Sequence, residues 1–296
     1  MNIESDFLGD WHHMVLHELQ QIDSTVDPAA DPSDLCIRYV NWRRRQVPKG
    51  PRTVHVAPEL QCPAALSGGF EALKDKIQRG DDLTAHLSIR LDDLEFDDGL
   101  LNDWGIYHLH LGTTPHPTKP AFVKRTGDVL MARFDNQNAY LIEIVPHQQW
   151  TRKRLLEIVH RQWPNTIAQY RVPGRPTQTF TEKQYAQLRK AGVLTMIELD
   201  GVGYQPLGGG SATSGVSVYV VNTCNRIIDS LRDYEAQLKA KATEVAEEFR
   251  SHVEADKGHA VSMGDILALR MQTDGETVWA VSRDLDATMR LGPLVR

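Results

Sequence analysis

The spacing of apolar residues divides the first half of the chain into helical and extended stretches. Apolar residues recur at helical intervals over 10–22, 35–45, 68–80 and 151–163, which predicts four helices. Gly80 is the last residue of the third stretch and suits a helix C-terminus, whereas Pro164 follows the fourth and ends it.

Three extended stretches lie between the last two of these helices. Residues 106–111, 128–134 and 139–145 are rich in β-branched and aromatic residues, and the last two are joined by a short Asp- and Asn-rich turn. We therefore expect an antiparallel meander. Helices that flank such a meander predict the α+β class.

The sequence changes character near a Pro- and Gly-rich segment at 171–179, which predicts a linker between two units, 1–170 and 180–296. The second unit is expected to contain a helix at 181–190, a Gly-rich loop at 207–215, a long acidic helix over 216–255 and a terminal hairpin that turns at Asp274 and Gly275. Apolar residues at roughly heptad intervals along the long helix fit packing within its own unit or a homodimer.

Composition and charge limit where in the cell the protein is expected to work. The chain has 296 residues, a net charge of −6, no apolar run of membrane-spanning length and no basic, apolar leader, so we expect a cytoplasmic protein without a membrane partner. Cys36, Cys62 and Cys224 are scattered without a CxxC pair, which predicts free thiols.

The net charge hides local basic segments. The stretch 36–55 carries six Lys and Arg residues and no acid, and a second basic group follows from 119 to 161. Such groups favour a nucleic-acid partner, here RNA. The candidate nucleic-acid contacts are Arg43, Arg44, Arg45, Lys124 and Arg133. The alternative is that the arginines pair with the acids at 92–98.

Candidate chemistry centres on the histidines of the first predicted strand. His108 and His110 are two residues apart, so they share one strand face, while Arg125 lies nearby in sequence and His147 ends the third strand. Neutral and protonated imidazoles with an adjacent cation suit acid/base cleavage of RNA. A metal site would need a third ligand, and His147, Asp128 and Glu143 are available but show no diagnostic spacing.

Two other motifs give weaker evidence for a functional site. His13 and His17 have the i, i+4 spacing of a HExxH zinc motif, but Met14 stands at the glutamate position, so we interpret them as surface residues. The Gly-rich loop lacks the lysine of a P-loop and is interpreted as a connector with Ser214 near a helix N-cap.

The order of helices, meander and helix over residues 36–165 resembles the compact fold of RelE-type toxins and of barnase-like and EndoU-like ribonucleases. The runs NWRRRQVPKGPRTVHVAPEL (41–60), NDWGIYHLHLG (102–112) and KRTGDVLMARF (124–134) are also similar to those of a group of uncharacterised bacterial proteins. The ribonuclease resemblance implies that His108 and His110 are acid/base residues, that His147 is a third candidate, and that Lys124 and Arg125 stabilise phosphate.

Three hypotheses follow. The leading one is a metal-independent ribonuclease of toxin or phage-defence type, without a cofactor, and with an inhibitor or antitoxin as a further partner. The second is a non-catalytic module that binds nucleic acid or protein through its arginines. The third is a metal-dependent enzyme built on the His108 and His110 pair.

Overall fold

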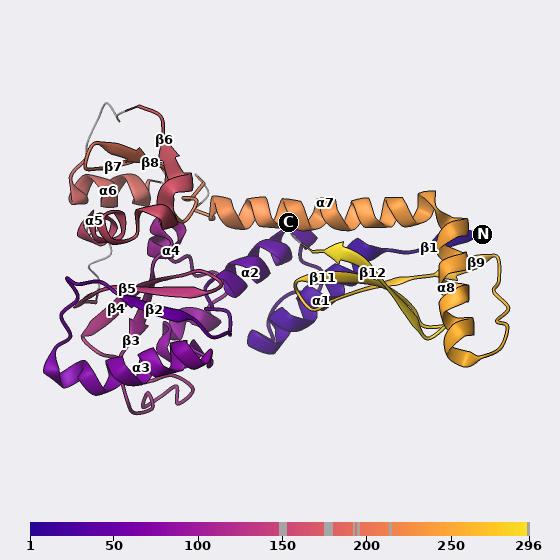
Figure 1. Cartoon of the computed structure of the whole chain (residues 1–296), viewed down its shortest axis with the longest axis horizontal. Coiled ribbons are helices and arrows are strands. Elements are labelled where there is room, and N and C mark those ends of the chain that lie inside the picture. The colour runs from indigo at the N-terminus through magenta and orange to yellow at the C-terminus, as the bar shows by residue number, and fades with distance from the viewer. Residues whose placement is uncertain (148–152, 175–179, 192, 194–195, 213–214, 295–296) are drawn as a thin grey trace. The chain divides into compact units, whose positions relative to one another are not determined.

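The computed structural model describes residues 1–147, 153–174, 180–191, 193, 196–212 and 215–294 (Figure 1). It confirms the α+β class, with helices and several small, mostly antiparallel sheets. The chain forms two compact units. Unit 1 consists of Met1–Val40 with Val221–Arg296, and unit 2 consists of Asn41–Val220. Within the described ranges, no helix is both long and apolar enough to cross a membrane.

This division differs from the one predicted at 171–179, a segment of which 175–179 lies outside the described residues. The reason is a contact between the two ends of the chain: β1 (Asn2–Glu4) pairs in parallel with β9 (Ile266–Ala268). Pairing between strands so distant in sequence leaves no local composition signal, so a linker-based prediction does not detect it.

Four helices contribute to unit 1. They are α1 (Phe7–Ile22), the first part of α2 (Pro32–Arg44), most of α7 (Val218–Ala240), and α8 (Ala242–Lys257). The single helix predicted over 216–255 is therefore wrong, because Lys241 departs from helical geometry with φ −111° and ψ 31°. Buried Leu231, Leu238 and Val245 keep seven-residue spacing across this break, which explains why periodicity does not reveal it.

The predicted terminal hairpin is confirmed. β10 (Arg270–Thr273) pairs antiparallel with β11 (Thr277–Ser282), and β12 (Ala287–Pro293) adds a third antiparallel strand. The Asp274 carboxylate accepts the backbone N–H groups of Glu276 and Thr277, while Gly275 adopts φ 93°. Both features belong to a tight turn.

Unit 2 is built on a four-stranded sheet. Its order is β2 (Thr53–Val56), β5 (Asn138–Pro146), β4 (Asp128–Phe134) and β3 (Tyr107–His110). The three predicted strands are confirmed as an antiparallel meander. β2 was not predicted, and it extends the sheet by pairing in parallel with β5.

The sheet of unit 2 is covered on both faces. Leu109 and Leu111 lie on the face covered by α3 (Ser67–Arg79), which ends at left-handed Gly80 as predicted. A β-carbon on Gly69 would lie 1.9 Å from the Leu111 carbonyl oxygen, so α3 approaches β3 this closely only with glycine there.

The opposite face carries Ile106, Val129 and Met131 in a second apolar cluster. Side chains from further elements of unit 2 complete this cluster. The remaining α-helices and strands described in unit 2 are α4 (Gly99–Trp104), α5 (Lys153–Gln162), α6 (Glu182–Lys190) and a small sheet with the strand order β6 (Arg171–Val172), β8 (Val202–Tyr204) and β7 (Ile197–Leu199). Alternate residues of a strand point to the same face of the sheet, so His108 and His110 lie on the same face as Ile106.

Candidate active site

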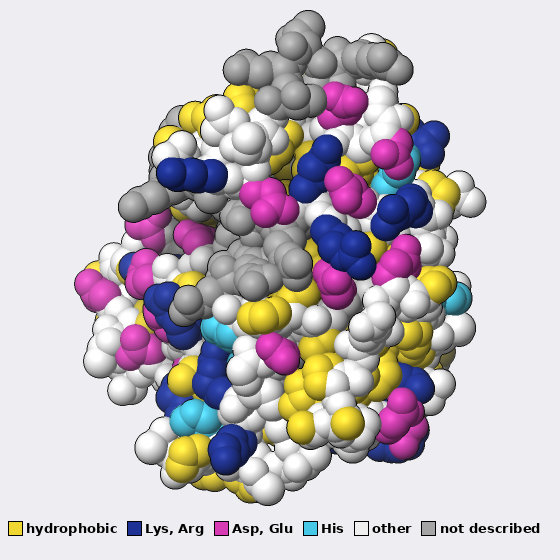
Figure 2. Space-filling view, turned by 90° about the vertical axis from the view of Figure 1, so that its left-hand side faces the viewer, with side chains coloured by type: hydrophobic (Ala, Val, Ile, Leu, Met, Phe, Trp, Pro, Cys, Tyr) yellow, Lys and Arg dark blue, Asp and Glu magenta, His cyan; other side chains and the backbone are white. Residues whose placement is uncertain are grey.

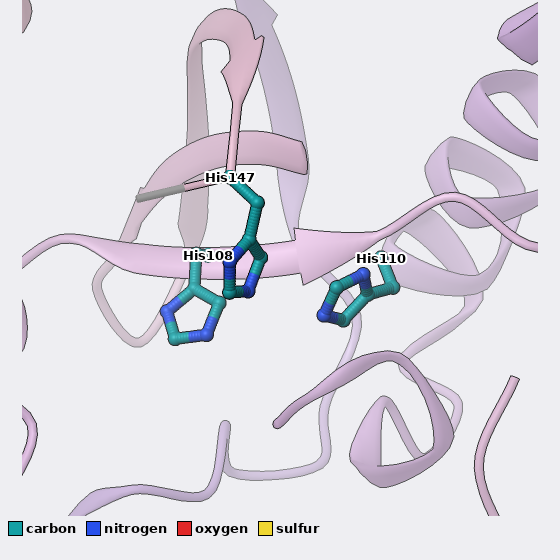
Figure 3. Close-up of side chains that lie close together, drawn as sticks. All are labelled: His108, His110 and His147. Carbon is teal, nitrogen blue, oxygen red and sulfur yellow. The ribbon is translucent and has the colours of Figure 1, made fainter. Parts of the chain in front are cut away.

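Three histidines of unit 2 converge on one side of β3 (Figure 3). His108 and His110 come from β3 itself, and His147 directly follows β5, where its backbone N–H donates to the Gly127 carbonyl at 2.8 Å. One ring nitrogen from each histidine lies within 4.8 Å of the others. His110 is only 1% exposed and His108 8%, so the structure brings together a largely buried imidazole cluster.

His108 lies beside a carboxylate that the sequence analysis did not single out. Asp98 Oδ2 is 3.6 Å from His108 Nδ1. Asp98 Oδ1 accepts the N–H groups of Leu100 and Leu101 at the start of α4, which fixes the orientation of the carboxylate. Burial lowers the pKa of His108, and Asp98 opposes this shift in part. His108 is therefore neutral at pH 7, with an anion placed to stabilise its protonated form.

His147 is held by Arg125. The guanidinium Nη2 donates to His147 Nε2 at 2.8 Å, and because a guanidinium has no acceptor, the bonded imidazole nitrogen carries no proton. Burial lowers the pKa of His147, and the neighbouring Arg125 lowers it further. His147 is thus a neutral imidazole whose proton sits on Nδ1.

His110 is the most perturbed of the three. Burial, followed by the charge of Arg125, lowers its pKa to about 3. The backbone N–H of Thr126 reaches His110 Nδ1 at a long 3.4 Å, and among the described residues the buried Nε2 has no hydrogen-bond partner. A buried polar nitrogen without a partner costs free energy, which the rest of the fold must offset.

A second buried histidine supports the strand from behind. His86 is 3% exposed, and its Nδ1 donates to the His110 carbonyl at 2.8 Å. Its Nε2 faces Lys76 Nζ at 3.2 Å, which fixes the tautomer. His86 therefore positions the end of β3 and has no place in the pocket lining.

Two of the three histidines, His108 and His147, open into a pocket of about 520 Å³, whereas buried His110 is not among its lining residues. His108, His147, Arg125 and Asp98 line it together with Arg90 and Phe96. Arg90 stacks on Phe96 with its guanidinium carbon 3.9 Å from the ring centroid. The volume suits a small molecule or one nucleotide. Asp97 and Asp98 also line the pocket, and Arg90 pairs with Asp93 at 2.8 Å, so Arg125 is the lining cation placed for an anionic group.

The predicted nucleic-acid contacts Arg44 and Arg45 have a different role. Arg44 donates to the carbonyls of Leu101 and Gly208 at 3.1 and 2.5 Å, and also bonds Asn102 and Ser217. Arg45, 5% exposed, donates to the carbonyls of Arg90 and Asp93 at 2.9 Å. Both guanidinium groups are occupied inside unit 2 and are structural, which is a correction to the prediction.

The other basic candidates lie apart from the pocket lining. Arg43 and Lys124 are exposed, and Arg133 on β4 is half-buried, with an Nη1 atom that has no partner in the described part of the chain. On the face that Figure 2 shows, Lys and Arg side chains lie among Asp and Glu at the upper right, and several gather with His side chains at the lower left. This face therefore carries a mixed charge pattern over much of its described surface.

The remaining motifs have structural roles. A β-carbon on Gly208 would lie 2.1 Å from the Leu101 carbonyl oxygen, so the Gly-rich loop is needed for close packing on α4. Ser214 lies outside the described residues. His13 and His17 are exposed on α1, as expected for surface residues, whereas His12 is half-buried.

Comparison of the chain with protein families, with curated proteins and with solved structures finds no match. The chemistry must therefore be inferred from the site itself.

Proposed function

We propose that unit 2 is a metal-independent ribonuclease with its active centre in the histidine pocket. The proposal depends on one observation: the pair of His108 with Asp98 and the pair of His147 with Arg125 line the same 520 Å³ pocket. This combination supplies a base, a group that orients it, and a cation for a phosphate.

In this proposal His108 is the general base. Its neutral imidazole takes the proton of the 2′-hydroxyl, and Asp98 stabilises the imidazolium that forms. The 2′-oxygen then attacks phosphorus, a bond to phosphorus forms, and the bond to the 5′-oxygen breaks. Arg125 donates to the phosphate oxygens as negative charge develops on them.

His147 is the proposed general acid, and substrate binding prepares it. In the free protein Arg125 occupies His147 Nε2 and lowers its pKa. A bound phosphate draws the Arg125 guanidinium toward its own oxygens and adds negative charge, and both changes raise the pKa of His147. The protonated ring then gives its proton to the leaving 5′-oxygen.

RNA is the substrate that this arrangement favours over DNA. No group in the proposed mechanism activates water by metal coordination, so an internal nucleophile gives the most accessible reaction. The 2′-hydroxyl is such a nucleophile, and DNA lacks it. The pocket volume admits about one nucleotide.

The test is cleavage of a defined oligoribonucleotide by purified protein in a chelator. The expected product ends in a 2′,3′-cyclic phosphate, and a substrate with one 2′-deoxy nucleotide at the cut position stays intact. The His108→Ala variant is expected to lose cleavage, while the exposed unit 1 variant His17→Ala retains it. Cleavage by His108→Ala at the wild-type rate, or cleavage of the deoxy substrate, contradicts the proposal.

A metal-dependent enzyme is the second candidate because three neutral histidines have ring nitrogens within 4.8 Å of one another. Asp98 beside His108 also fits the carboxylate that often orients a metal-bound histidine. The fit is incomplete, since Arg125 occupies His147 Nε2 and Thr126 N–H faces His110 Nδ1. Titration with Co²⁺ tests it: absorption bands of a histidine-bound ion that vanish in His147→Ala support this candidate.

A further inference from the structure

Unit 1 contains two cysteines that the proposed ribonuclease site does not use. Cys36 lies on α2 and Cys224 on α7, and they are only 1% and 4% exposed. Cys224, Ile228 and Arg232 are four residues apart on one face of α7. Ile228 and Arg232 line the same pocket as Cys36, so the faces that carry the two thiols meet.

The two thiols are close enough to shift each other's pKa. The neighbouring Cys224 thiol is the largest cause that lowers the pKa of Cys36, and the Cys36 sulfur is the largest cause that raises the pKa of Cys224. The buried indole N–H of Trp11 has no hydrogen-bond partner among the described residues, and Trp11 also lowers the pKa of Cys36. Cys36 is thus the thiol on which a thiolate forms more easily.

A path for a small reagent reaches Cys36. The pocket that Cys36 lines has a volume of about 270 Å³. Apolar Leu8 and Trp11 and the cationic Arg232 also line it. Hydrogen peroxide is far smaller than this volume. Cys62, by contrast, is half-buried, and burial raises its pKa.

We infer that Cys36 and Cys224 form a redox-active pair that a hydroperoxide converts into a disulfide. The Cys36 thiolate attacks the peroxide, which is reduced to water once it takes up a proton, and Cys36 becomes a sulfenic acid. The Cys224 sulfur then attacks the Cys36 sulfur. The S–S bond forms, the hydroxyl leaves as water with the Cys224 proton, and both thiols are oxidised.

The position of the pair gives the disulfide a structural effect. α2 and α7 contain the two points at which the chain passes between the units, after Val40 and after Val220. A bond between Cys36 and Cys224 closes the chain segment that includes all of unit 2. It therefore restricts the unfolded chain strongly, and the oxidised protein is expected to unfold at a higher temperature than the reduced one.

The test treats the folded full chain with hydrogen peroxide, blocks the remaining thiols with an alkylating reagent under denaturing conditions, and maps peptides by mass spectrometry. The expected result is a peptide linked through Cys36 and Cys224, two hydrogens lighter than the reduced pair, with Cys62 alkylated. A reductant should restore three alkylated cysteines and the lower unfolding temperature. Alkylation of all three cysteines after peroxide treatment overturns the inference, as does a link that involves Cys62.

Two variants separate the steps. In Cys224→Ser the partner thiol is absent, so dimedone is expected to trap a sulfenic acid on Cys36. In Cys36→Ser neither the linked peptide nor dimedone labelling of Cys224 is expected. Dimedone labelling confined to Cys224 or Cys62 contradicts the assigned order of attack. Circular dichroism of both variants checks that they fold, and none of these readouts depends on ribonuclease activity.

Discussion

Half-buried Arg44 and buried Arg45, at the C-terminal end of α2, can be compared with buried His108 and His110 of β3. All four are polar residues of unit 2, yet their surroundings differ. Arg44 and Arg45 direct their donors to backbone carbonyls such as those of Leu101 and Asp93. His110 Nε2 has no hydrogen-bond partner in the described chain. Buried polar groups with full sets of partners stabilise a fold, whereas a buried group without a partner costs free energy that the rest of the fold must offset, and such groups are common near functional sites.

The largest expected effect is on catalysis. Replacement of His108 by alanine removes the proposed base, so we expect RNA cleavage to fall about a thousandfold. Single-turnover cleavage of the oligoribonucleotide in a chelator measures it. The thermal midpoint of the variant must be compared with that of wild type, and a fall in cleavage that only tracks unfolding contradicts the assigned role.

Replacement of Arg44 is expected to lower the free energy of unfolding. Arg44→Ala leaves the Leu101 and Gly208 carbonyls without their donor, and we expect the free energy of unfolding to fall by about 3 kcal/mol. The neighbouring exposed Arg43→Ala should change it by less than about 0.5 kcal/mol. Urea titrations of both variants check this difference, and equal effects mean that Arg44 is not structural.

Asp98→Asn isolates the orientation of the base. Asparagine keeps an oxygen for the α4 N-cap but removes the charge beside His108. We expect kcat to fall about 10- to 100-fold with little change in KM or stability. If Asp98→Asn keeps the wild-type kcat, the Asp98 charge has no part in catalysis by His108.

The pKa of His110 makes a prediction about how stability changes with pH. Its folded pKa of about 3 lies below the unfolded value of about 6.5, so the unfolded chain binds more protons between these values. Stability from this group is complete above pH 6.5 and is lost as the pH falls toward 3, at about 1.4 kcal/mol per pH unit. The His110→Gln variant should lose this component. Urea unfolding in a chelator at pH 4 to 7 compares the two slopes, and identical slopes contradict the assigned pKa shift.

The local parts of this picture could be predicted from sequence. Alternation places His108 and His110 on one strand face, and helical spacing with a final glycine fixes the end of α3 at Arg79. Asp98 was missed because it lies in an acidic run, although its place before the Gly99 helix start is an N-cap signal. The fates of Arg44 and Arg45 depend on carbonyls distant in sequence, which no local pattern encodes.

The smallest expected effect concerns the exposed cations and decides between enzyme and binding module. Arg43 and Lys124 remain available to a phosphate backbone after Arg44 and Arg45 are assigned to the fold. If each contacts one phosphate, replacement by alanine should weaken RNA binding a few-fold at low salt and reduce the salt slope by about 1. Fluorescence anisotropy of a labelled oligoribonucleotide across a KCl series measures both quantities. One outcome favours a non-catalytic module that binds RNA through its surface: the protein cleaves no RNA, binding persists without His108 and His110, and binding weakens when Arg43 and Lys124 are replaced.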